Sequence, residues 1–226
     1  MATFQSQIEG LTNLTLTTTS TPSTTQVDQF LNDGVIDFTT NYLKAFPAEG
    51  AMFARVSAEA TSNPLDVNSA SILSVVRESG VNDDWRVCRK SFPGMEAMLQ
   101  DKQSIHYASK VNPAYIQVGD NISVYPSPDA NENAIKVYYV NNEPQDGSDG
   151  ALTVADSTID NFPSNKVYLI VVYAAMKAIE AKMAEYTVSE EDPELMESYA
   201  ANLQVLRGQY YQSFGSQQQQ GGGNEN

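Results

Sequence analysis

The sequence predicts an α+β fold, in which an antiparallel bundle of three main helices carries an inserted β-rich domain and extended terminal arms. Apolar residues recur every three or four positions in residues 25–46, 164–185 and 190–212, which is the period of an amphipathic helix. Between the first two segments the pattern changes to short runs rich in Val, Ile, Tyr and Phe, bounded by turn-forming residues. The expected divisions are a helical bundle at 25–50 and 159–214 and a β-rich insertion at 51–142.

The first 24 residues are predicted to form an extended arm. They are dense in threonine and serine, and Leu11, Leu14 and Leu16 are the apolar anchors of the threonine-rich stretch. β-branched residues without a local partner favour either a strand that pairs with another subunit or a frayed terminus.

The first long helix has recognisable start and stop signals. Thr25 and Asp28 form a pattern like a capping box, and Pro47 ends the helix. Gly34 lies in the interior, where glycine costs about 1 kcal/mol relative to alanine. We therefore expect Gly34 to mark either the close approach of another helix or a bend.

The insertion is expected to be a small sheet or sandwich. Turn-forming residues at 80–84, 119–121 and 127–133 predict three hairpins. Residues 93–102 read as a short helix, with a proline near its start. Cys88 lies in a strand pattern, where its side chain would point away from those of its cationic neighbours, and this favours a core cysteine.

The stretch at 159–183 is predicted to be the central helix of the bundle. Pro163 and Ser164 supply a fixed φ and a possible N-cap. Four small residues would let another helix approach closely: Ala174, Ala175, Ala178 and Ala181. The apolar surface is broader than one stripe, as expected for a helix contacted from two sides.

A short turn and a capping box from Ser189 to Asp192 lead into the last helix, so these two helices should form an antiparallel hairpin. By composition, residues 143–158 are expected to be a linker. Residues 215–226 are expected to be a polar low-complexity tail.

Composition excludes several classes of function. The formal net charge is −15, which disfavours a sequence-specific DNA-binding protein. A single cysteine, Cys88, and a single histidine, His106, leave no disulfide within the chain and no histidine-pair metal motif. No nucleotide-binding loop or nucleophile elbow occurs, and we expect His106 to be structural or surface-exposed.

The N-terminal residues lack a basic region followed by an apolar core, and no apolar run reaches the roughly 18–20 residues needed to cross a bilayer. The expected compartment is therefore a cytoplasm.

Opposite charges are concentrated in two parts of the chain. Five of the thirteen basic residues lie within 26 positions, and residues 180–197 contain seven acidic residues. Such patches can meet head-to-tail between neighbouring subunits of a ring. The alternative is scattered surface charge of little energetic effect. The five basic residues are Arg77, Arg86, Arg89, Lys90 and Lys102.

Several stretches resemble virion proteins of tailed bacteriophages, especially marine ones. They include TQVDQFLNDGVIDFTTNYL, CRKSFPGMEAMLQDKQSIHYASKVNPAYI followed by ISVYP, and IDNFPSNKVYLIVVYAAMKAIEAKM. The phrase FPSNKVYLIVVYAAMKAIE is similar to the helix of head-to-tail adaptor, or neck, proteins. The resemblance covers most of residues 1–212.

The resemblance implies a structural virion protein at the head–tail interface, assembled in the host cytoplasm. Such adaptors form rings, commonly of twelve copies, between the portal and downstream tail or nozzle proteins. DNA passes through the ring without specific binding, and terminal arms clasp neighbouring subunits. The family has no catalytic, metal-binding or cofactor-binding residues to carry over.

The candidate contacts between subunits or with the portal are Leu11, Leu14, Leu16, Arg86, Arg89, Lys90, Glu190, Glu191, Asp192, Tyr210 and Tyr211. The alternatives are another phage component, namely a tail-tube, terminator or capsid-associated protein. A soluble enzyme and a host-side binding module with a β-sandwich also stay open.

Overall fold

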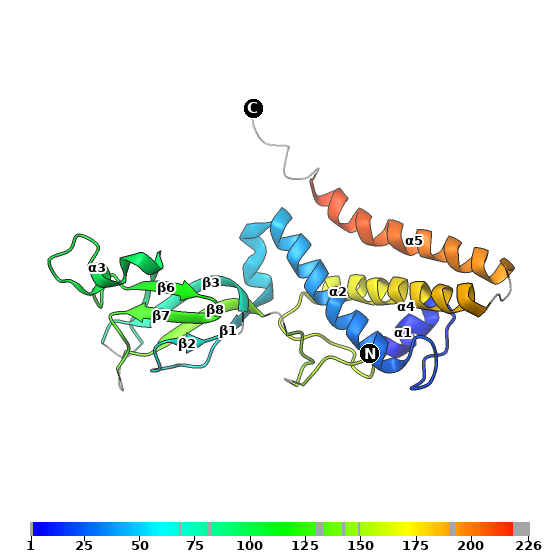
Figure 1. Cartoon of the computed structure of the whole chain (residues 1–226), viewed down its shortest axis with the longest axis horizontal. Helices are drawn as coiled ribbons and strands as arrows, with labels where there is room; N and C mark the ends of the chain where they lie inside the picture. Colours follow the sequence, from blue (N-terminus) through cyan, green and yellow to red (C-terminus); the bar gives the residue numbers. More distant parts are fainter. Residues whose placement is uncertain are drawn as a thin grey trace, which may run out of the picture. The chain divides into compact units, whose positions relative to one another are not determined.

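The computed structural model describes residues 2–67, 69–80, 83–129, 133–141, 143–148, 150–189 and 193–218. The chain divides into two compact units (Figure 1). Met1–Glu49 and Glu143–Asn226 make up the helical unit, and Gly50–Asn142 make up the β unit. Helices and sheets are both present, so the α+β class is confirmed. In the described part of the chain, no helix combines the length and apolar character needed to cross a membrane.

The helical unit is built around α4 (Val167–Ser189), which contacts α1, α2 and α5. Because three helices pack against it, α4 is apolar on nearly all sides. Its buried residues are Ile170, Val171, Val172, Ala174, Ala175, Met176, Ala178 and Ile179. The partner helices are α2 (Thr24–Ala45) and α5 (Pro193–Gln218), together with α1 (Phe4–Thr12).

The extended arm expected at the N-terminus is wrong, because α1 is a packed helix. The Thr3 side chain caps it by accepting a hydrogen bond from the Ser6 amide. Phe4 and Ile8 lie four residues apart on one face, and both are fully buried. Helix α1 therefore packs on α4, as α2 and α5 also do.

The segment expected to be a linker is packed into the helical unit. Leu152 and Val154 are buried. The amides of Phe4 and Gln5 donate to the carbonyls of Asp156 and Val154, both at 2.8 Å. The polar composition of this segment did not predict these contacts, because the hydrogen bonds are formed mostly by backbone amides and carbonyls.

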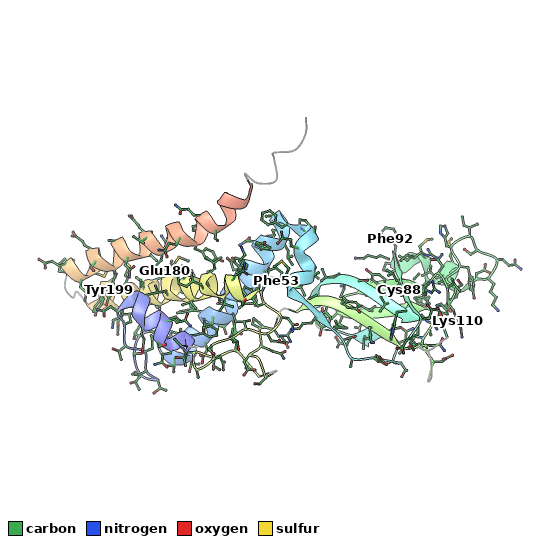
Figure 2. The ribbon with its side chains drawn as sticks, turned by 180° about the vertical axis from the view of Figure 1, so that it is seen from behind. Phe53, Cys88, Phe92, Lys110, Glu180 and Tyr199 are labelled. Carbon is green, nitrogen blue, oxygen red and sulfur yellow. The ribbon has the colours of Figure 1, made fainter. Side chains whose placement is uncertain are left out.

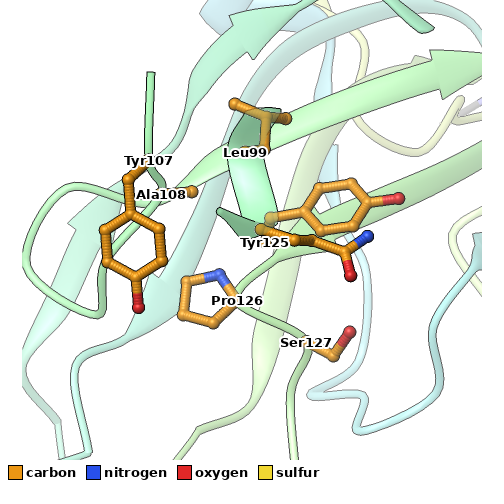
Figure 3. A pocket seen from close by; sticks show the side chains of 7 residues that line it. Leu99, Tyr107, Ala108, Tyr125, Pro126 and Ser127 are labelled. Carbon is orange, nitrogen blue, oxygen red and sulfur yellow. The ribbon is translucent and has the colours of Figure 1, made fainter. Parts of the chain in front are cut away.

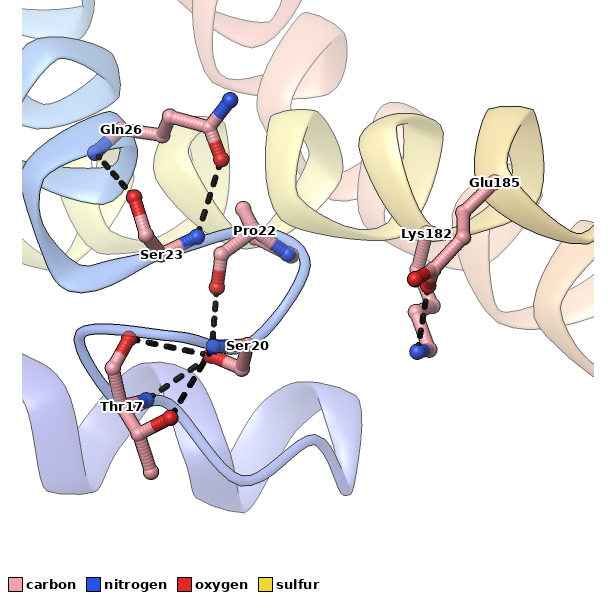
Figure 4. A network of polar contacts seen from close by, with 7 residues as sticks. All are labelled: Thr17, Ser20, Pro22, Ser23, Gln26, Lys182 and Glu185. Carbon is pink, nitrogen blue, oxygen red and sulfur yellow. Dashed lines mark hydrogen bonds and ion pairs between the residues drawn. The ribbon is translucent and has the colours of Figure 1, made fainter.

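The cap of α2 lies two residues earlier than expected. Ser23 forms a capping box with Gln26, in place of the Thr25 pattern (Figure 4). Upstream, Ser20 Oγ bridges the carbonyls of Thr17 and Pro22. These bonds hold the turn between α1 and α2.

The boundaries of the last two helices also differ from expectation. Ser164–Lys166 form a single 3₁₀ turn before α4 begins. Residues 190–192, expected to cap the last helix, lie outside the described residues. The last helix, α5, continues to Gln218, so the first residues of the expected tail are helical; residues 219–226 lie outside the described part.

The β unit contains two four-stranded sheets. The first has the order β1-β8-β3-β4, and the second β2-β7-β6-β5. The strands of the first sheet are β1 (Ala54–Val56), β8 (Ile135–Asn141), β3 (Ser69–Glu78) and β4 (Trp85–Val87). Those of the second are β2 (Leu65–Asp66), β7 (Asn121–Tyr125), β6 (Ala114–Val118) and β5 (Arg89–Ser91).

Two of the three predicted hairpins are confirmed. β3 pairs antiparallel with β4, and β6 with β7; Gly80 and Gly119 take positive φ angles of 97° and 60° in these turns. The third prediction, at 127–133, is wrong. β7 and β8 belong to different sheets, so this segment carries the chain from one sheet to the other.

The core of the β unit lies between the two sheets. Val75 and Ile135 from the first sheet pack with Ile122 and Val124 from the second. Cys88 joins this cluster where the chain passes from β4 to β5, and it is 4% exposed. Burial raises the pKa of its thiol to about 12, so the prediction of a core cysteine is confirmed.

Arg77, expected to belong to a basic surface patch, is instead buried in the β unit at 1% exposure. Its guanidinium donates to the carbonyls of Glu78, Pro126 and Ser127. A buried arginine needs such partners. Here it fixes the segment that follows β7.

Candidate interaction surface on the α3 cap

Residues 92–112 form a cap over the second sheet, which we call the α3 cap. It begins with the 3₁₀ turn Pro93–Met95 and continues as α3 (Glu96–Gln100), so the predicted short helix is confirmed. Leu99 and Ala108 are both 1% exposed and pack against the face of β6 and β7 that points away from the sandwich core. Both faces of this sheet are therefore covered.

The alternation along β6 explains this burial. Tyr115 faces the core shared with the first sheet, whereas Ala114 and Ile116 face the α3 cap. The burial pattern of β6 accordingly starts with three buried residues in succession.

Three hydrogen bonds attach the α3 cap to the sheet. Arg89 donates from one terminal nitrogen to the carbonyls of His106 and Tyr107. The Tyr125 hydroxyl donates to Glu96 Oε1 at 2.7 Å. Burial, followed by this carboxylate, raises the pKa of Tyr125 to about 12. The cap is thus held through backbone carbonyls and one buried hydroxyl.

The α3 cap exposes four large apolar side chains. Ile105 is 94% exposed, Phe92 80%, Val111 69% and Met98 48% (Figure 2 labels Phe92). Single exposed apolar residues are common, but four within 20 residues of one short segment indicate a contact surface.

Basic residues accompany these apolar side chains. Lys102 and Lys110 belong to the α3 cap, and Lys90 lies on the adjoining edge strand β5. All three are exposed, and none pairs with a carboxylate of the residues that the structure describes. Of the two acids in the cap, Glu96 accepts from Tyr125, and Asp101 accepts from the Gln103 amide at 2.9 Å.

A hollow of about 180 Å³ lies between the α3 cap and the end of β7 (Figure 3). Its floor is apolar, since Leu99, Ala108 and Tyr125 are buried. Gln100 and Ser127 add polar groups. The lining suits an aromatic side chain that ends in a polar group. The full lining is Leu99, Gln100, Tyr107, Ala108, Tyr125, Pro126 and Ser127.

Three of the contact residues predicted from the sequence are instead parts of the helical core. Leu14 and Leu16 are 8% and 3% exposed, and Tyr210 is 1% exposed. The Tyr210 hydroxyl donates to Asp37 Oδ2 at 2.8 Å. They are corrected to internal residues, because α1 and α5 fold onto their own chain.

The structure places the other predicted contact residues in different environments. Leu11 is half-buried, and its carbonyl accepts from Asn202 at 2.9 Å. Arg86 is exposed and pairs with Asp84, whereas Arg89 anchors the α3 cap. Lys90 and Tyr211 are exposed. Glu190, Glu191 and Asp192 lie outside the described residues.

Sequence reasoning missed the apolar surface of the α3 cap. The helical period at 93–102 was visible, with Met95 and Leu99 on the side that packs inward. Ile105 and Val111 stand as isolated apolar residues in a polar segment, which is a weak signal. The side chain of His106 is half-buried, and only its backbone carbonyl takes part in the anchoring.

The net charge is distributed unevenly between the two units. The helical unit contains 18 acidic and 5 basic residues, a net charge of −13. The β unit contains 10 acidic and 8 basic residues, a net charge of −2. No group of three or more potential metal ligands occurs among the residues that the structure describes.

An exposed apolar cap on a β-sandwich, together with a strongly acidic helical unit, is typical of a protein that works through contacts with other proteins. The chain matches the model of the SU10 adaptor protein family over residues 3–224, and it belongs to that family. It is therefore a bacteriophage adaptor, a structural component of the virion that interacts with other structural proteins of the phage. No curated protein matches the chain.

Proposed function

We propose that this adaptor joins the phage head to the tail as a ring-forming neck component, through which the DNA passes. Its partners would be other copies of itself, the portal protein and the downstream tail or nozzle proteins. Membership of an adaptor family supports this role. The ring would hold twelve copies, as is common in the proteins that the sequence resembles.

The charge distribution is the observation that carries the proposal. A helical unit of net charge −13 repels a polyanion, so DNA can slide past it without binding. Some of these acidic residues also accept hydrogen bonds from other residues of the same unit. Asp28 accepts from the Val154 amide at 2.7 Å, and Asp37 from Tyr210. The helical unit therefore combines a stable core with a negative surface.

The oppositely charged patches suggest which surfaces of neighbouring copies would meet in the ring. Arg86 and Lys90, on the edge strands β4 and β5, would face the acids at 190–192 of the next copy. Contacts between two different patches close into a ring when the rotation between copies permits.

Electron microscopy of phage particles, combined with portal binding, tests the function. We expect the protein at the neck, in a ring below the portal, and we expect purified protein to bind isolated portal rings. A location in the tail tube or on the capsid would contradict the proposal and favour the other structural roles. Failure to bind the portal and to form rings would refute it.

A further inference from the structure

We propose that the α3 cap of one copy docks on the outer face of α5 of a neighbouring copy, whose Tyr211 occupies the hollow beside β7. This contact rests on the proposed ring, and it names the two surfaces that meet. They are two different patches of the same chain, as a head-to-tail contact requires.

The outer face of α5 lies opposite the face that packs on α4. Leu203, Leu206 and Tyr210 are buried at helical spacing. On the other side of the helix, Val205 is 58% and Tyr211 67% exposed. The members of the outer face, at intervals of three or four residues, are Glu194, Glu197, Ala201, Val205, Gly208 and Tyr211.

Gly208 is not explained by packing within its own chain. A Cβ at this position would meet no atom within 4 Å, although a glycine in a helix interior costs about 1 kcal/mol relative to alanine. The missing side chain leaves free space beside Tyr211, one turn further along. A second chain can therefore approach the α5 backbone closely at this point.

The two surfaces are complementary in charge. Lys102 and Lys110 are exposed on the α3 cap, and Lys90 is exposed on the adjoining strand β5. Glu194 and Glu197 are exposed at the start of α5, on a unit of net charge −13. Opposite potentials steer two copies together and disfavour contacts between like surfaces. The opposite charges therefore favour a second copy of this chain as the partner that binds the α3 cap.

The apolar parts also correspond. The outer face of α5 offers Val205 and Tyr211, and the α3 cap offers Phe92 and Ile105. A tyrosine suits the hollow, because Leu99 and Ala108 supply an apolar floor and Gln100 a polar partner for the hydroxyl. Tyr211 would thus act as the anchor of the contact.

Disulfide trapping tests the pairing directly. Full-length Ser127→Cys and Tyr211→Cys proteins are prepared separately, mixed and oxidised. We expect a disulfide-linked heterodimer, with Cys88 unreacted because it is buried. The matched control replaces Tyr211→Cys with Lys44→Cys, at an exposed position of α2. A heterodimer yield no higher than that of the control overturns the proposal.

Charge reversal with rescue provides a second test, read by sedimentation velocity. The Lys102→Glu/Lys110→Glu and Glu194→Lys/Glu197→Lys proteins should each self-associate about tenfold more weakly than the wild type, because like charges then face each other. Combining the two pairs of changes should recover most of the association, and Lys44→Glu should leave it unchanged. The proposal is overturned if either double variant associates as strongly as the wild type. It is also overturned if the protein that carries all four changes associates no better than either double variant.

These results separate the contact from the function. If rings assemble on the portal while both tests fail, the surface is wrong and the adaptor role stands. If the wild type neither binds the portal nor forms rings, the proposed function fails, whichever surfaces associate in solution.

Discussion

Gly34 of α2 lies directly against the ring of Tyr173 on α4. A Cβ at position 34 would stand 2.9 Å from Tyr173 Cδ1 and 3.4 Å from a methyl group of Ile170. This glycine marks the close approach of two helices, one of the two possibilities that the sequence left open.

Replacing Gly34 with alanine should destabilise the helical unit by about 1–3 kcal/mol, because overpacking outweighs the helix propensity that alanine gains. Chemical denaturation measures the change. Gly10→Ala in α1 is the matched control, since no atom lies within 4 Å of its Cβ position. It should be neutral or stabilise by up to about 1 kcal/mol. Equal effects at both sites would contradict the close approach.

The hydrogen bond from Tyr210 to Asp37 joins α5 to α2. Tyr210→Phe should lower the free energy of unfolding by about 1–3 kcal/mol, because the half-buried Asp37 carboxylate loses its donor. Tyr211→Phe, one residue further along on the exposed side, should change stability by less than about 0.5 kcal/mol. A stable Tyr210→Phe protein would show that Asp37 finds another donor.

Ile8 should be essential for stability, contrary to the expectation of a loose arm. Ile8→Ala removes a fully buried side chain and should cost about 2–5 kcal/mol. Val205→Ala, in the same unit but 58% exposed, is the control and should cost far less. Thermal unfolding of the two proteins gives the comparison. A normal melting temperature for Ile8→Ala would restore the arm hypothesis.

Stability should fall in alkaline solution. Burial raises the pKa of Tyr42, Tyr125 and Cys88 to about 12 each, and raises that of Tyr210 further. The unfolded chain releases these protons at the ordinary values of 10.0 for tyrosine and 9.0 for cysteine, whereas the folded protein keeps them. The free energy of unfolding is therefore at its full value below about pH 9, and it decreases as the pH rises toward 12.

Urea denaturation between pH 8 and pH 11.5 measures this dependence. The Tyr210→Phe protein should show a shallower decrease than the wild type, because it has lost one of the buried groups that titrate. A constant free energy of unfolding across the range would refute the assignment.

Arg89 should control the order of the α3 cap. Arg89→Met removes the donor to the His106 and Tyr107 carbonyls, so hydrogen exchange in residues 105–109 should accelerate by about tenfold or more. Arg86→Met, on the preceding strand β4, changes an exposed residue that pairs with nearby Asp84 and should leave the exchange unchanged. Unchanged exchange in both proteins would place the anchoring elsewhere.

The long helices were predictable because their sequence carries a strong local period. The apolar breadth of α4 indicated contacts on more than one side, and three helices do pack against it. Helix α1 was missed because only three apolar residues, Phe4, Ile8 and Leu11, show its period within a polar stretch. Its stability comes from burial against α4, and sequence periodicity cannot reveal such a contact.

The topology of the β unit was harder to predict. Turn residues at 127–133 look the same whether the next strand pairs with the last or joins another sheet, and only long-range packing decides. The role of Arg89 was hidden for a similar reason. Its partners are backbone carbonyls 17 and 18 residues away, and these carry no sequence signal.

Within the β unit, the first strand, β1, pairs with the last, β8, and Ala54 stands opposite Val140. The two ends of residues 54–140 therefore lie side by side, within about 6 Å at the paired Cα atoms. A short glycine-rich bridge could close the gap if this block were cut out, and the block could be produced separately with both ends adjacent. The pairing of β1 with β8 therefore lets the chain enter and leave this block at one place.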